Sequence, residues 1–95
     1  MPAAARLGDN CTGHGCYPGR PIVEGSGNVF INGKPAARVG DMLDTHCCGP
    51  SCHDGVITEG SGSVFINGKP AARIGDAVSC DSALAEGSSN VNIGG

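Results

Sequence analysis

The sequence predicts a small all-β protein with pseudo-threefold symmetry, built from three copies of one β-hairpin repeat. The repeat is visible twice: residues 25–41 read GSGNVFINGKPAARVGD, and residues 60–76 read GSGSVFINGKPAARIGD. The copies are 35 residues apart, and only two of their 17 positions differ. A period of this length is typical of repeat architectures.

The two ends of the chain supply the third copy. Residues 87–95 read GSSNVNIGG and resemble the first half of the repeat, whereas residues 3–9 read AAARLGD and resemble its second half. An open array of repeats needs caps on its ends. Halves that complement each other predict a closed ring instead, with one repeat split between the termini.

Each complete copy predicts a hairpin. Val29–Ile31 is a short run of β-branched and aromatic residues. The following Asn32-Gly33 favours a type I′ turn, in which both central residues have positive φ. Residues 36–39 are expected to form the returning strand.

The hairpin register places Phe30 opposite Pro35 at a non-hydrogen-bonded position, where proline's missing N–H costs nothing. The second copy repeats this pair as Phe65 and Pro70, and the split copy replaces it with Asn92 and Ala3. The ring therefore does not require an aromatic residue at this position.

An Arg-x-Gly-Asp ending closes every copy: Arg6 with Asp9, Arg38 with Asp41, and Arg73 with Asp76. These arginines are either binding residues or parts of a recurring ion pair and turn that join neighbouring copies. Repetition in every copy favours the structural interpretation.

Composition limits the class of protein. The 95 residues predict one domain, 1–95, with no further domain attached. Three aromatic residues and 17 glycines give a thin core, and small scaffolds usually need a metal, disulfides or oligomerisation. The net charge of −3, without a basic stripe, argues against nucleic-acid binding.

The chain carries no targeting or membrane-spanning pattern. Its N-terminus, MPAAARLGD, lacks the charged and apolar regions of a signal peptide. No apolar run approaches the roughly 20 residues of a membrane span. We expect the protein to be made in the cytoplasm and to stay there unless another machine exports it.

Three loops leave the repeats directly after Gly-Asp, and pseudo-symmetry places all three on one face. They comprise residues 10–24, 42–59 and 77–86. They contain every histidine and cysteine of the chain: His14, His46, His53, Cys11, Cys16, Cys47, Cys48, Cys52 and Cys80. This segregation predicts a metal site on the loop face.

Spacing selects four ligands among these residues. The first two loops place His14 and His46 five residues after the repeat aspartate, and the third places Cys80 four residues after it. His53 lies seven residues beyond His46, where the long loop can turn back through Gly-Pro. Three histidines and one cysteine predict one closed, tetrahedral, structural Zn²⁺ site without a catalytic water.

Other interpretations of the cysteines stay open. Six cysteines also allow a disulfide framework with 15 connectivities, which a reducing cytosol and the adjacent Cys47 and Cys48 disfavour. We therefore expect most of the other cysteines to be free thiols. Each of Cys11, Cys16, Cys47, Cys48 and Cys52 remains an alternative ligand, and Cys11 and Cys16 can pair in an oxidising medium. Asp44 and Asp54 are either partners of the imidazole N–H groups or simply solvated.

The Pro-Ala-Ala-Arg of residues 35–38 and 70–73, with the split ends and the opening CTGHGCYPGRP, closely resembles the PAAR-repeat family. The resemblance covers essentially the whole chain. It implies a short, sharp β-cone with zinc near its apex, held by three histidines and one cysteine. In this sequence those residues are His14, His46, His53 and Cys80.

The resemblance also implies a function. Members of the family cap and sharpen the trimeric VgrG spike of the type VI secretion system, which delivers them outside the cell or into target cells. The expected partners are one VgrG trimer per cone and effector proteins, with no stable homo-oligomer and membrane contact only during piercing. Docking is expected through the strand edges around Val29–Ile31, Val64–Ile66 and Asn90–Ile93.

No catalytic residues are expected, because the chain has no Ser/His/Asp arrangement and its carboxylates lie mainly in turns. Two alternatives from other classes are a small zinc-dependent hydrolase and a disulfide-stapled secreted scaffold. The hydrolase would need an open coordination position and a nearby general base.

Overall fold

The computed structural model describes residues 1–79 and 81–95. These residues form eight strands paired in four antiparallel hairpins: β1 (Phe30–Ile31) with β2 (Lys34–Pro35), β3 (Met42–Cys48) with β4 (Ser51–Val56), β5 (Phe65–Ile66) with β6 (Lys69–Pro70), and β7 (Ala77–Val78) with β8 (Ser82–Ala83). The described chain has no helix, and hence none that could cross a membrane. The predicted all-β class is confirmed.

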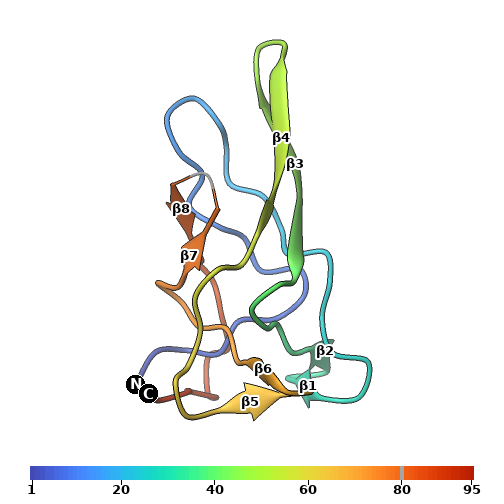
Figure 1. Ribbon diagram of the computed structural model, residues 1–95, viewed down its shortest axis with the longest axis vertical. Helices are drawn as coiled ribbons and strands as arrows, with labels where there is room; N and C mark the ends of the chain where they lie inside the picture. Colours follow the sequence, from blue (N-terminus) through green and yellow to red (C-terminus); the bar gives the residue numbers. More distant parts are fainter. Residues whose placement is uncertain (80) are drawn as a thin grey trace.

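The molecule is elongated, with extents of 38 × 23 × 23 Å. The β3–β4 hairpin protrudes at one end, which we call the tip (Figure 1). The other end, which we call the base, carries β1, β2, β5, β6 and the two chain termini (Figure 1). A regular conical outline stays a prediction.

The repeat hairpins have the predicted register. Phe30 pairs with Pro35, and Phe65 pairs with Pro70. The turn residues Asn32 and Gly33 have φ values of 55° and 78°, as a type I′ turn requires. The split copy keeps the pairing as one bridge between Ala3 and Asn92, so no strand forms over residues 90–93.

The prediction of a returning strand over residues 36–39 is wrong: the strand is Lys34–Pro35, because the chain changes partner after Pro35. Ala36 bridges Arg6 of the split copy, Arg38 bridges Ala71, and Arg73 bridges Ala4. The three bridges lead from each copy to the next and back to the first. The repeats therefore hold one another rather than forming three independent hairpins.

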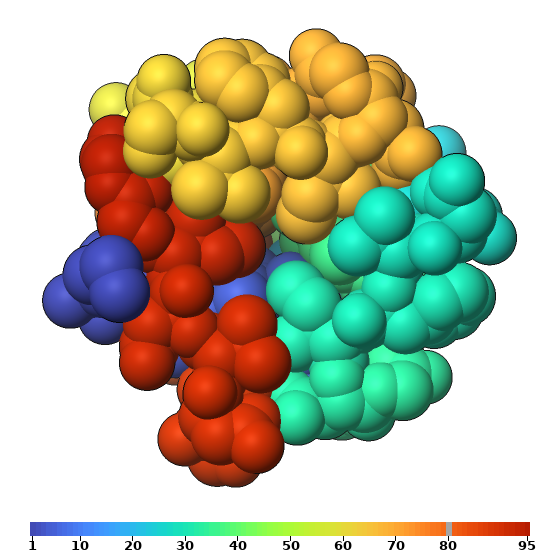
Figure 2. Space-filling model, turned by 90° about the horizontal axis from the view of Figure 1, so that it is seen from below, coloured from blue at the N-terminus to red at the C-terminus, as the bar shows by residue number. Residues whose placement is uncertain are grey.

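Three backbone hydrogen bonds close the ring. The N–H of Ala37 donates to the carbonyl of Ala5, that of Ala72 to Ala37, and that of Ala5 to Ala72, each at 3.0 Å. Seen from the base, the three copies occupy three sectors around one centre, and the N-terminal residues lie beside the C-terminal ones (Figure 2). The predicted closed ring with one split repeat is confirmed.

The core lies in two layers along this ring. The layer nearer the base contains Ala4, Ile31, Ala36, Ile66, Ala71 and Ile93. The layer nearer the tip contains three bridged pairs, which are Ile22 with Leu43, Ile57 with Val78, and Leu84 with Cys11. Cys11 thus occupies a pseudo-symmetric position filled elsewhere by Leu43 and Val78, and it is 3% exposed. A buried free cysteine there acts as a small apolar residue.

The Arg-x-Gly-Asp endings are structural, as expected. In each copy the arginine Nε and Nη2 donate to the carboxylate of the aspartate, which also accepts the arginine's backbone N–H. The third nitrogen, Nη1, reaches the next copy at Asn32, Asn67 or the Gly94 carbonyl. These bonds to aspartate outweigh desolvation and raise the pKa of all three arginines.

Candidate metal centre

The hairpin of β3 and β4 carries two of the predicted ligands. Its register pairs His46 with His53 and Cys47 with Cys52 across a turn at Gly49-Pro50, where Gly49 has a φ of 61°. Directly opposed residues of an antiparallel pair lie on the same face. The two imidazoles therefore meet on one face of the hairpin.

This hairpin corrects the sequence prediction for residues 42–59. They were expected to be a loop, yet they contain the two longest strands of the described chain. The predicted turn at Gly49-Pro50 is right. The strands gave little signal because polar residues, histidines and cysteines interrupt the apolar alternation that marks a strand.

The first loop delivers the third imidazole. His14 sits in a tight turn that pairs it with Tyr17, between Gly13 and Gly15 with φ values of 72° and 54°. Its Nε2 lies 3.2 Å from the Nε2 of His53, which lies 2.7 Å from the Nε2 of His46. One ligand atom of each histidine lies within 4.8 Å of the others, so the three could hold a metal ion.

His46 is the most firmly placed of the three. It is 4% exposed, and its Nδ1 lies 2.8 Å from the carbonyl oxygen of Pro18. A carbonyl only accepts, so Nδ1 carries a proton, and Nε2 is the nitrogen that could bind a metal. Metal-bound histidines commonly make such a hydrogen bond with the nitrogen that does not bind the metal. Asp44 does not fill this role for His46, because the Pro18 carbonyl occupies Nδ1; the side chain of Asp44 accepts the Thr45 N–H.

The donor set fits a metal ion. Zn–N distances of about 2.0–2.1 Å in a tetrahedral site separate two ligand nitrogens by roughly 3.3 Å, near the observed 3.2 Å. The Nε2 atoms of His46 and His53 lie closer, at 2.7 Å, than two nitrogen ligands of a tetrahedral Zn²⁺ would. Partial desolvation and the charges of His46, Arg20 and His14 lower the pKa of His53. The lowered pKa favours the neutral imidazole that metals bind.

The fourth predicted ligand, Cys80, lies outside the described residues. The alternative ligands are accounted for: Cys11 is buried in the core, while Cys16–Cys48 and Cys47–Cys52 are disulfides. The expectation of mostly free thiols is therefore wrong for four cysteines. Adjacent Cys47 and Cys48 both pair because their side chains point to opposite faces of β3.

Arg20 contacts the strand that carries His53, and the sequence analysis did not identify it as a site residue. It is 2% exposed, and its Nη1 donates to the His53 carbonyl at 3.1 Å. Its Nε and Nη2 have no partner among the described residues. Gly55 makes room for it, because a Cβ there would lie 2.8 Å from the Arg20 Cζ and 3.3 Å from Val78.

Tyr17 also escaped the sequence analysis. Its ring centroid lies 4.7 Å from that of His14, 4.8 Å from His46 and 4.4 Å from His53. Its hydroxyl hydrogen-bonds to the Ser51 hydroxyl at 2.8 Å. The only available signal was its place three residues after a predicted ligand.

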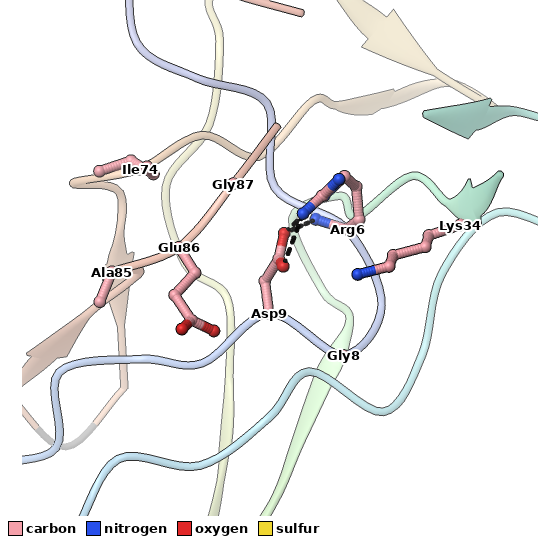
Figure 3. Close-up of a pocket in the computed structure, with 8 residues that line it drawn as sticks. All are labelled: Arg6, Gly8, Asp9, Lys34, Ile74, Ala85, Glu86 and Gly87. Carbon is pink, nitrogen blue, oxygen red and sulfur yellow. Dashed lines mark hydrogen bonds and ion pairs between the residues drawn. The ribbon is translucent and has the colours of Figure 1, made fainter. Parts of the chain in front are cut away.

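A surface pocket elsewhere is not a second site. It is lined by Arg6, Asp9, Lys34 and Glu86, among others, and its dashed bonds join Arg6 to Asp9 (Figure 3). The Glu86 carboxylate accepts the Asn10 N–H at 2.8 Å. Equivalent bonds run from Met42 to Glu24 and from Ala77 to Glu59. These charged groups belong to the repeating scaffold.

A model of a known protein family matches the chain. The family model described as PAAR motif matches twice, over residues 2–49 and 49–95. The protein belongs to the PAAR motif family, which is a family of structural spike-tip proteins. Membership is consistent with a spike-tip protein of a type VI secretion system. No curated protein matches the chain.

Proposed function

We propose that this protein is the structural tip that caps the trimeric VgrG spike of a type VI secretion system and sharpens it for membrane piercing. The observation that carries the proposal is the closed three-copy ring, which has its histidine cluster toward one end and a repeated surface at the other. A trimer offers its partner the same surface three times. One chain with three similar sectors matches that symmetry.

The base has the chemistry of a docking surface. Phe30 and Phe65 are each 56% exposed, and Val29 and Val64 are 36% and 38% exposed. Exposed apolar side chains that recur at equivalent positions are typical of protein-binding surfaces. We expect contact with the spike to depend little on moderate salt, because apolar contacts are not screened.

The metal would stabilise the tip. His14, His46 and His53, with Cys80 as the fourth ligand, would hold one Zn²⁺ between the loops and the hairpin. Such a structural ion contributes directly to folding free energy. The two disulfides reinforce the same end, joining the first loop to β3 and β3 to β4.

The disulfides also bear on location. We propose that the protein is assembled in the cytoplasm and delivered outside the cell or into target cells, with effector proteins attached. Disulfides persist in oxidising compartments and are rare in the cytosol. Two disulfides at the tip therefore favour a destination outside the cytoplasm.

Charge placed at the two ends tests the orientation. Val29→Glu and Val64→Glu introduce charge at the base, whereas Thr45→Glu introduces it on β3, an exposed position toward the tip. Binding to an immobilised VgrG trimer should weaken for the base variants and stay unchanged for Thr45→Glu. The opposite ranking would mean that the tip end docks.

A further inference from the structure

We propose that Tyr17 covers the metal centre and limits the access of water and of exogenous ligands to the three-histidine cluster. The inference deepens the proposed function, because it rests on the metal site and explains why that site is structural. It assigns a role to the aromatic side chain of the first loop.

The phenol ring of Tyr17 lies close to all three imidazoles. Its centroid is 4.4–4.8 Å from all three imidazole centroids, with interplanar angles of 31° to 42°. A ring packed against one histidine alone would lie much farther from the other two. Tyr17 therefore lies over the cluster as a whole and fills space through which solvent would reach it.

The Tyr17 residue is held in place both at its backbone and at its hydroxyl. At its backbone, the Tyr17 N–H donates to the His14 carbonyl at 2.8 Å, and the His14 N–H donates back at 3.1 Å. At its tip, the hydroxyl bonds to Ser51, the first residue of β4. The cover and one ligand thus share a turn, while the hydroxyl is tied to the strand that carries His53.

A disulfide reinforces this arrangement. Cys16 immediately precedes Tyr17, and its partner Cys48 pairs with Ser51 in the hairpin register. The covalent link therefore spans the same two elements as the Tyr17–Ser51 hydrogen bond. The disulfide holds the first loop on the hairpin, so the ring can leave the cluster only by a rotamer change that breaks the Tyr17–Ser51 hydrogen bond.

The chemical consequence is exclusion of water. The hydroxyl of Tyr17 is directed to Ser51, so the part of the side chain over the imidazoles is the ring, which offers no lone-pair ligand of its own. An apolar ring over the cluster limits the access of water to the metal, and a hydrolytic metal site would need such a bound water. The cover also slows the loss of the ion, because a chelator must displace the ring first.

Co²⁺-loaded protein provides the test. Tyr17→Ala removes the ring, while Tyr17→Phe and Ser51→Ala each remove only the hydrogen bond. With excess chelator, release from Tyr17→Ala should be about tenfold faster than from the parent, the lower end of the effect of removing groups around metal ligands. Tyr17→Phe and Ser51→Ala should give equal and smaller increases. Added azide should change the visible Co²⁺ spectrum of Tyr17→Ala only.

The results of these experiments distinguish a failure of the metal site from a failure of the proposed role of Tyr17. If the parent binds no Co²⁺, both the metal site and its cover are wrong. If the parent binds Co²⁺ but Tyr17→Ala releases it at the parent rate and ignores azide, only the cover is wrong. A lower melting temperature of Tyr17→Ala without faster release would show a purely structural residue and would also overturn the inference.

Discussion

Replacing Asp41 by alanine should destabilise the protein strongly, because this carboxylate anchors one corner of the ring. Asp41 is 2% exposed and accepts three hydrogen bonds from Arg38: from the backbone N–H at 2.8 Å, Nε at 2.9 Å and Nη2 at 2.8 Å. The Arg38 side chain is only 12% exposed, so water cannot fully replace the carboxylate.

The size of the effect follows from these contacts. Alanine leaves a largely buried guanidinium and one backbone N–H without their acceptor. Removing one partner of a buried ion pair costs about 3–5 kcal/mol. We expect a loss of that size in the free energy of unfolding. Because the pair recurs in every copy, Asp9→Ala and Asp76→Ala should cost about as much.

Urea unfolding followed by far-UV circular dichroism measures this loss, with the disulfides intact and the metal saturating. Asp44→Ala is the matched control, because Asp44 is exposed and, among the described residues, its side chain accepts only the neighbouring Thr45 N–H. It should change the free energy of unfolding by less than about 0.5 kcal/mol. A loss below about 1 kcal/mol for Asp41→Ala would refute the buried-pair argument.

Two further predictions concern the tip. Protein expressed with ample zinc should contain one Zn²⁺ per chain, and His46→Ala should lose the metal and melt at a much lower temperature; metal analysis that finds far less zinc in the parent would contradict this. The intact mass of unreduced protein should fall short of the reduced mass by two hydrogen atoms for each of the two disulfides, Cys16–Cys48 and Cys47–Cys52. Equal masses would show that the four cysteines are thiols.

The ring could be predicted because its determinants are local and repeated. An Asn-Gly turn sets the register of each hairpin, and Phe30 opposite Pro35 follows from that register. The split repeat follows from two complementary ends, and the Ala3–Asn92 bridge bears it out. The convergence of His14 and His46 follows from their position after equivalent aspartates, and that of His53 follows from the turn at Gly49-Pro50.

The tip was less predictable because its contacts join loops of unlike sequence. The disulfides depend on Cα separations of 5.5 Å for Cys16–Cys48 and 4.1 Å for Cys47–Cys52. These distances exist only once residues 42–56 form a hairpin, and no apolar alternation marked it. The placement of Tyr17 over the histidines likewise depends on how the first loop docks on that hairpin, which no spacing rule encodes.

The mass of the complex with VgrG tests the proposed function most directly. The three sectors of the base differ, since Asn92 stands where the other copies have phenylalanine, and one chain already supplies all three sectors. Light scattering on a mixture with excess protein should therefore give the mass of one chain bound to one VgrG trimer. A complex with three chains per trimer, or no complex with any trimeric spike protein from the same source, would contradict the account.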